Sequence, residues 1–432
     1  MTDRGLLSVV PERPREDGPE WLAALRRDAL ARLRESGFPS KKHEKWRFTS
    51  VRDVVETAFS EATGAADARG WARDRLGGEE GFRVVLADGV PQLEGAPPRG
   101  VRVTSLREAL ASDAAQRLEP VLGRIAPAEP FAALNATMFT DGALVVLEEG
   151  ASVEAPIALV HVALESAEPA AAYPRVIVIA EPGSRGALVE TFLAQGGAKH
   201  LTNAVAEVAL GEGARLDHTR VVLGTDRAYH LAHLAVRQDR GSAYGSHVVT
   251  LGGALSRLEL DVTLAGEGAE AVLEGVYHVD GSEHVDHQLF VDHAAPRVSS
   301  RARYRGLLDG RGHAVANLMG VVRKSAPGTS VHQENRNLLL SDDATIDAKP
   351  HLEIETDDVQ ASHGATVGAV DEPSLFYLRS RGVPEALARD VLTFAFVREL
   401  LERIPSASVA ARATEAVLAR LPSGPEIREL FA

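Results

Sequence analysis

The segment GEGARLDHTRVVL, residues 211–223, follows a pattern that returns along the middle of the chain. A polar or acidic residue and a glycine come first, a few small or polar residues follow, and a β-rich run ends the unit. The same pattern is found at residues 148–160, 181–193, 239–251, 266–279, 279–291 and 308–320. Its marker glycines are Gly150, Gly183, Gly213, Gly241, Gly268, Gly281 and Gly310. Successive markers lie 27 to 33 residues apart, except for one gap of 13.

This repeat predicts a β-solenoid. Recurrence at such a period is typical of coils that bury their apolar faces only by stacking on neighbouring coils. No helical pattern interrupts the region, so a parallel β-helix fits it better than a helical repeat does. We expect the glycines at corners between strands, because glycine tolerates positive φ and close backbone approach. The sequence has no P-loop and no GxGxxG motif, so we do not expect the chain to hydrolyse ATP itself.

The composition excludes several classes of protein. The 432 residues are 45% apolar and 25% charged, which is typical of a soluble globular protein. No apolar run is long enough to span a bilayer, and the first residues lack the core of a signal peptide, so we expect a cytoplasmic protein without membrane contact. The chain has no cysteine and thus no thiolate of its own for a disulfide or a cluster. A net charge of −14 argues against nucleic-acid binding.

Three regions are expected along the chain. Residues 1–135 predict a mainly helical region with a short β element, in which the span Trp21–Arg75 has helical spacing of leucines. Residues 136–370 contain the solenoid. Residues 371–432 predict a helical domain, because an apolar stripe of period 3.6 starts after Pro384 and stops at Pro405.

The segment from Lys349 to Gly382 concentrates the residue types that carry chemistry. Leu352 and Ile354 alternate with Glu353 and Glu355, which predicts a strand with one carboxylate face. Ser362, His363 and Gly364 follow, and we interpret them as a turn. The acid and proline of Asp371-Glu-Pro-Ser then predict the start of a helix.

His363 is the strongest candidate for a metal ligand in this segment. Neutral imidazole binds iron or zinc, and the other ligands could be carboxylates of this chain or thiolates of another. The alternative is a histidine that only hydrogen-bonds a carbonyl at a corner. Further histidines crowd the solenoid, some of them beside acids that would suit a divalent metal. Residues three apart on a strand face opposite sides, so we favour a solvated strand face over a metal site. These histidines are His230, His233, His278, His284, His287 and His293.

Residues 334–368, ENRNLLLSDDATIDAKPHLEIETDDVQASHGATVG, with the following FYLRSRGV segment, closely resemble the SufB/SufD family of the SUF iron–sulfur cluster assembly machinery. The likeness covers about residues 301–396 well and extends loosely to the repeats and to KHEKWRFTS, residues 42–50. It implies a mainly β fold, a right-handed parallel β-helix flanked by N-terminal and C-terminal helical regions. This agrees with the fold that the repeat itself predicts.

Within the family the chain resembles the SufD subunit. SufB carries a cysteine in the loop where this chain has Ala344, and some relatives have one where it has Ala361. The resemblance implies that His363, with Ser362 and Gly364, lies at an interface with SufB and takes part in cluster assembly. Glu353 and Glu355 are weaker candidates for iron contact, since a solvated acidic face explains them as well.

The resemblance also implies partners. A cysteine-bearing SufB-like paralogue would share a transient cluster or iron with this chain, which alone would bind no cofactor. A SufC-like ATPase would dock on the C-terminal helices, for which the candidate residues are Phe376, Tyr377, Arg379 and Arg381. The expected function is thus that of a non-catalytic scaffold. A purely structural lever without metal contact and a β-helix carbohydrate enzyme are the alternatives, and self-pairing of the isolated chain stays open.

Overall fold

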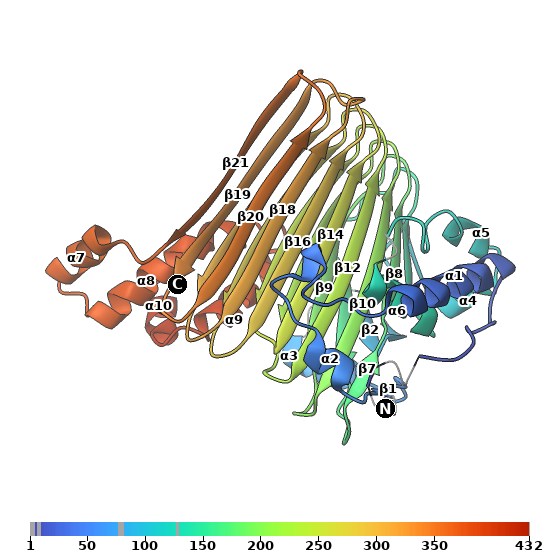
Figure 1. The fold of residues 1–432 in the computed structure, drawn as a ribbon, viewed down its shortest axis with the longest axis horizontal. Helices are drawn as coiled ribbons and strands as arrows, with labels where there is room; N and C mark the ends of the chain where they lie inside the picture. The colour runs from blue at the N-terminus through green and yellow to red at the C-terminus, as the bar shows by residue number, and fades with distance from the viewer. Residues whose placement is uncertain (1–4, 7–9, 77–81, 127–128, 432) are drawn as a thin grey trace.

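The structure is a computed structural model that describes the chain except for residues 1–4, 7–9, 77–81, 127–128 and 432 (Figure 1). Its centre is a β-solenoid of two sheets, and in the described part of the chain eight successive coils each give one strand to each sheet. Helices lie at both ends of the chain. The predicted mainly β solenoid with flanking helices is therefore confirmed.

The two sheets are called sheet A and sheet B. Going from the N-terminal end of the solenoid, sheet A consists of β4 (Val101–Ser105), β5 (Gly142–Leu147), β8 (Arg175–Ala180), β10 (His200–Leu210), β12 (Ala228–Gln238), β14 (Leu255–Leu264), β16 (His284–His293), β18 (His313–Val322) and β20 (Thr345–Ile354), with β7 (Ala170–Ala172) and β1 (Ser60–Glu61) beside it. Sheet B consists of β3 (Val90–Glu94), β2 (Arg83–Ala87), β6 (Ile157–Ala163), β9 (Arg185–Ala194), β11 (Arg215–Leu223), β13 (Ala243–Leu251), β15 (Glu270–Val279), β17 (Ser299–Leu308), β19 (Thr329–Leu339) and β21 (Val359–Gly368).

Successive coils are parallel and in register, so equivalent side chains stack along the solenoid. Leu234, Leu260, Leu289 and Leu318 form one such column in sheet A, and all four are buried in the interior. Side chains of a strand alternate between this interior and the outer face. A residue's place in the register therefore tells whether it faces the core or the outside.

The predicted corner role of the glycines is confirmed. All seven marker glycines have positive φ, between 57° and 71°. The gap of 13 residues arises because Gly268 precedes a strand of sheet B, whereas Gly281 and Gly310 precede strands of sheet A and so belong to the opposite corner. Arg297 (φ 55°) and Gly328 (φ 73°) continue the first row. The glycine pattern does not mark Arg297, because this position has arginine where the row otherwise has glycine.

The N-terminal region closes one end of the solenoid. There β3 pairs with β2 and β4 pairs with β5, both antiparallel. Helices and apolar side chains of this region cover the outer face of sheet A. The expected helical span of residues 21–75 is only partly helical. The elements are α1 (Glu20–Ser36), the 3-10 turn η2 (Glu44–Trp46), α2 (Arg52–Glu56), α3 (Arg69–Leu76), α4 (Leu106–Leu110), α5 (Ala115–Leu118) and α6 (Pro130–Met138).

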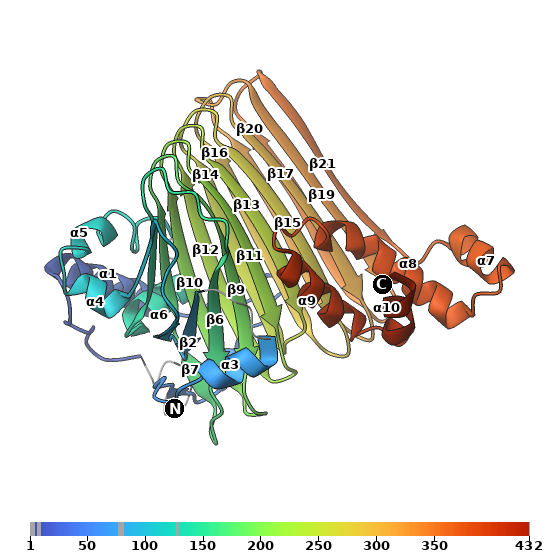
Figure 2. The same cartoon turned by 180° about the vertical axis from the view of Figure 1, so that it is seen from behind.

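The C-terminal region packs against the outer face of sheet B (Figure 2). Its elements are α7 (Glu372–Ser380), α8 (Glu385–Leu401), α9 (Ala407–Leu418) and α10 (Gly424–Phe431). The predicted stripe is confirmed, since Phe394, Val397 and Leu401 of α8 are buried against the sheet. Helix α7 projects away from the solenoid (Figures 1 and 2).

Among the described residues, none of the helices combines the length and the apolarity needed to cross a bilayer.

Candidate functional site

The candidate site lies on the last coil, which consists of β20 and β21. Both views place β21 at the outer edge of the solenoid, at the end opposite the N-terminal helices (Figures 1 and 2). All of β21 except its first residue is exposed, and Val367 keeps 50% of its surface open. In β20, Ile354 is 43% exposed. Apolar side chains that would be buried in any earlier coil face solvent here because no further coil covers them.

His363 lies in the middle of strand β21, so the predicted turn is wrong. Its register partner in the previous coil is Gln333, which is 3% exposed and belongs to the interior row of β19. By alternation, His363 occupies the interior row of the last coil. It is exposed there, and none of the described residues forms a hydrogen bond or ion pair with its side chain. The imidazole is thus presented at the open mouth of the solenoid.

Ser362 and Gly364 flank His363 and belong to the outer face of sheet B. The Ser362 hydroxyl lies 2.6 Å from Nδ1 of His332 in the previous coil, and Gly364 stands opposite Glu334. His332 and Glu334 are not among the residues predicted for this site. The repeat period could have found both, because each precedes its neighbour by 30 residues, about one coil.

The two candidate carboxylates do not lie with His363. Glu353 is on β20 in sheet A, where its carboxylate is 3.5 Å from Nε2 of His351. Glu355 follows that strand and accepts from the backbone N–H of Lys324 at 3.3 Å. Among the described residues, no group of three or more histidine, aspartate or glutamate side chains could hold a metal ion. A complete metal site would need ligands from outside the described residues.

Helix α7 begins as predicted, directly after the last coil. The Asp371 carboxylate accepts from the backbone N–H of Ser374 at 2.8 Å and caps the helix. Leu375 is buried, whereas Phe376 is 71% and Tyr377 57% exposed.

Two arginines accompany these aromatic rings. The guanidinium of Arg381 lies 5.3 Å from the ring centre of Tyr377. Arg379 faces Glu385 of α8 at 3.4 Å. The four predicted docking residues thus lie on and directly after one projecting helix, with two large apolar side chains open to solvent.

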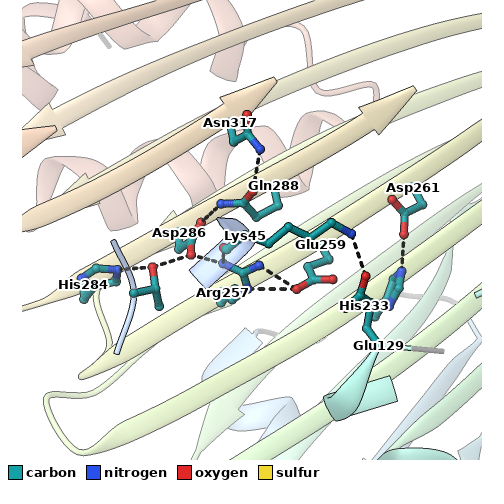
Figure 3. A network of polar contacts seen from close by, with 11 residues as sticks. Lys45, Glu129, His233, Arg257, Glu259, Asp261, His284, Asp286, Gln288 and Asn317 are labelled. Atoms are coloured by element: carbon teal, nitrogen blue, oxygen red, sulfur yellow. Dashed lines mark hydrogen bonds and ion pairs between the residues drawn. The ribbon is translucent and has the colours of Figure 1, made fainter. Parts of the chain in front are cut away.

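A second polar site holds the N-terminal segment on the outer face of sheet A. The segment of residues 42–50 is called the strap. Figure 3 shows Arg257 at the centre of the network, with its guanidinium donating to Glu259 at 2.7 Å and to Asp286. Arg257 also lies 3.7 Å from the ring centre of Trp46 and donates to the carbonyl of Lys45 at 3.0 Å. The ion pairs of the buried guanidinium are therefore completed by contacts with the strap.

The strap reaches toward the last coil as well. Thr49 donates to Asp286 at 2.5 Å and lies 3.0 Å from Nε2 of His284. At its other side, Nζ of Lys349 on β20 donates to Glu44 at 2.7 Å. The strap thus crosses the outer face of sheet A from β14 to β20. In these contacts the strap ties the N-terminal segment to sheet A.

The solvated strand face predicted for the other histidines is wrong. His284 and His287 do face opposite sides, but both sides are covered: His284 lies under the strap, and His287 lies in the interior, 3.0 Å from Oγ1 of Thr250. Burial lowers the pKa of His284 to about 3 and that of His287 to about 4. The remaining four are buried as well: His230, His233, His278 and His293. These imidazoles fill the core and its covered faces.

Comparison of the sequence with known proteins identifies the family of the chain. The family "SUF system FeS cluster assembly, SufBD core domain" matches residues 162–396. The chain is 28% identical to the iron–sulfur cluster assembly protein SufD of Escherichia coli K12 over 91% of this chain and 92% of the relative. It is 31% identical to an iron–sulfur cluster assembly SufBD family protein of Mycobacterium tuberculosis, over 96% of both chains. The chain therefore belongs to the SufBD family of SUF iron–sulfur cluster assembly proteins and is most like SufD.

Proposed function

We propose that this chain is a non-catalytic scaffold subunit of a SufBCD-type complex that assembles iron–sulfur clusters. The observation that carries the proposal is His363, exposed at the open mouth of a solenoid whose last coil has no cover. Since the chain has no cysteine, sulfur and thiolate come from a SufB-like partner. The partner and this chain would form the site together.

The chemistry assigned to His363 is that of a transient ligand. Neutral imidazole is a good ligand for iron, and thiolate is the usual ligand of iron in a cluster. Iron that arrives at the shared interface is the cargo of the complex, and the imidazole nitrogen holds it while partner thiolates complete the coordination. The chain by itself binds no cluster.

The geometry of β21 supports the partner assignment. One side of this strand pairs with β19, and the other side is a free edge in the described part of the chain. A free edge offers unpaired N–H and C=O groups, and another strand can add to it by main-chain hydrogen bonds. A SufB-like solenoid whose own last strand is free would pair with β21 beside His363.

The test of the His363 role is the substitution His363→Ala in the assembled complex. We expect the complex to form and its iron and sulfide content after loading to fall strongly, because one ligand is lost. His351→Ala is the matched control, since His351 is a half-exposed imidazole of the same coil on sheet A. Unchanged loading in an intact complex would contradict the ligand role and support the structural lever.

The projecting helix α7 supports docking of a SufC-like ATPase. Phe376 and Tyr377 expose apolar rings beside Arg379 and Arg381, a combination enriched at protein interfaces. The double substitution Phe376→Ala and Tyr377→Ala should abolish capture of the ATPase and spare binding of the SufB-like partner. Leu430→Ala is the control, because Leu430 is also an exposed apolar side chain but lies on α10. Equal loss in the control would contradict docking at α7.

Self-pairing of the isolated chain and a cytoplasmic location stay predictions. Sedimentation of the purified chain measures the first, and fractionation of cells measures the second.

A further inference from the structure

A row of charged residues on the outer face of sheet B points to the free edge of β21. In register, Glu274 of β15 stands opposite Arg303 of β17, Arg303 opposite Glu334 of β19, and Glu334 opposite Gly364 of β21. These three charged residues are called the charge row. Its charges alternate, as cross-strand neighbours do when they stabilise a sheet. The row ends at Gly364, whereas continued alternation would place a positively charged side chain there.

The inner part of the charge row is held by ion pairs. Glu274 is buried, forms an ion pair with Arg303, and accepts from Nε of Arg403 at 3.0 Å. Arg303 also faces Glu399 of α8 at 3.6 Å. The C-terminal helices thus complete the row where they cover it.

The outer end of the charge row is incomplete. Glu334 keeps about a quarter of its side chain exposed, and it forms an ion pair with the half-exposed Arg336 of the same strand at 2.8 Å. A Cβ added at Gly364 would meet no atom within 4 Å, and the backbone of Gly364 does not require glycine. The position between Glu334 and the free edge is therefore empty space that a side chain could enter.

We propose that the strand that pairs with β21 in the complex carries a lysine or arginine opposite Gly364, and that this cation completes the charge row by binding Glu334. Paired strands lie about 4.8 Å apart, so a long basic side chain on the added strand reaches across Gly364 to the carboxylate. The inference rests on the proposed function, because that function supplies the partner strand. It goes beyond that function by assigning to Glu334 the selection of the partner.

The sequence of β21 argues for a different chain as the occupant. Residues 359–368, VQASHGATVG, contain no lysine and no arginine. A second copy of this chain that paired through its own β21 would bring no cation to Glu334. A partner with a basic residue at this place gains an ion pair that the self-pair lacks, so the charge row favours the mixed complex over the homodimer.

The first test measures the affinity of the full chain for the cysteine-bearing SufBD paralogue of the same organism. Glu334→Gln should weaken binding roughly tenfold, as expected when a desolvated charge pair at an interface is broken, and should reduce the salt dependence. Glu270→Gln, at the exposed start of β15 and three coils away from β21, is the control and should leave affinity unchanged. Equal affinity of the Glu334→Gln variant and the wild type overturns the inference.

A second variant supplies the cation within the chain. Gly364→Lys places an ammonium group beside Glu334, so it should raise the melting temperature of the isolated chain and weaken binding of the paralogue. Gly364→Ala is the reference for the melting temperature, because it removes the conformational freedom of glycine without adding a charge, and it should leave binding unchanged. A Gly364→Lys variant that binds as tightly as the wild type overturns the inference. The inference is also overturned if EDTA abolishes binding of the wild type but not of Glu334→Gln, since a divalent cation on Glu334 would then complete the row.

Failure of the inference can be told from failure of the proposed function. If the wild-type chain does not bind the paralogue, both fail together. If it binds and His363→Ala loses iron loading while Glu334→Gln binds normally, only the inference fails.

Discussion

The two ends of the solenoid are built in opposite ways. At the N-terminal end, β3 and β4 run antiparallel to their neighbours, and helices cover the adjoining sheet. At the C-terminal end, β20 and β21 continue the parallel pairing of the coils and then stop. A solenoid needs caps because its end coils expose unpaired strands and apolar side chains. This chain closes one end and leaves the last strands of the other end uncovered, and the partner that we propose would associate there.

The contacts that hold each end differ in the same way. Beside the closed end, the buried Glu207 carboxylate accepts from the backbone N–H groups of Gly123, Ile125 and Ala126 at 2.8–3.1 Å and pairs with buried Arg175. On the last coil, the contact with the N-terminal region is the exposed ion pair between Lys349 of β20 and Glu44 of the strap. Removal of one partner of a buried pair leaves a buried charge uncompensated and is strongly destabilising, whereas exposed pairs contribute little.

The largest effect is expected when the same substitution is made at a glutamate of each end. Glu207→Ala should lower the free energy of unfolding by about 3–5 kcal/mol, because it removes the carboxylate partner of buried Arg175 and the acceptor of three partly buried N–H groups. Glu353→Ala on the last coil should change it by less than about 0.5 kcal/mol. Urea unfolding followed by circular dichroism measures both. Similar losses at the two positions would contradict the contrast between a sealed and a bare end.

A matched pair of valines gives the next largest effect. Val145→Ala, in the interior of β5, should cost about 2–3 kcal/mol through lost burial and a cavity. Val367→Ala, in the interior row of β21, should cost almost nothing in the isolated chain because half of the side chain is already solvated. Thermal unfolding measures the difference.

Binding of the partner should make the Val367→Ala substitution costly, in contrast to its small effect in the isolated chain. In the complex that we propose, Val367 becomes buried, so Val367→Ala should weaken association while Val145→Ala leaves it unchanged. A Val367→Ala variant that binds with wild-type affinity would mean that this row stays exposed in the complex.

The sequence predicted the coils but not the difference between the ends. The glycine pattern marks corners wherever a coil turns, and this local signal is the same in a covered and an uncovered coil. Whether Val145 or Val367 is buried depends on contacts with residues far away in sequence. His363 shows the same limit: its neighbours Ser362 and Gly364 favoured a turn, yet register pairing with β19 makes all three part of a strand.

The sealed interior should make stability fall in acid. Burial lowers the pKa of His287 to about 4, whereas a histidine in the unfolded chain titrates near about 6.5. Below pH 6.5 the unfolded state binds the proton more readily, so stability is full above this pH and is lost as pH falls toward 4. His287→Asn should remove about 2 kcal/mol of the loss between pH 7 and pH 5.

The control for this pH effect is Thr250→Val, which removes the hydroxyl near the imidazole and keeps the titrating group. It should lower stability by a similar amount at both pH values. If His287→Asn and Thr250→Val show the same acid dependence, the loss in acid arises elsewhere.

The smallest effect concerns a corner in the half of the solenoid that leads to the bare end. Arg297 stands at φ 55° in a row of residues that otherwise has glycine, and its ion pair with Glu267 is exposed. Arg297→Gly relieves the left-handed strain of a side-chain residue but gives the unfolded chain more freedom, so the net gain should be about 0.5–1 kcal/mol. Gly268→Ala in the same row should lower stability by about 1 kcal/mol.

Hydrogen exchange of the Arg297→Gly variant tests how far this effect extends. Because coils stabilise mainly their neighbours, exchange should slow in β17 and β19 and stay unchanged in β5 and β8. Uniform slowing along the whole solenoid would instead mean that the closed and the open end unfold as one unit, and the contrast between them would then concern binding alone.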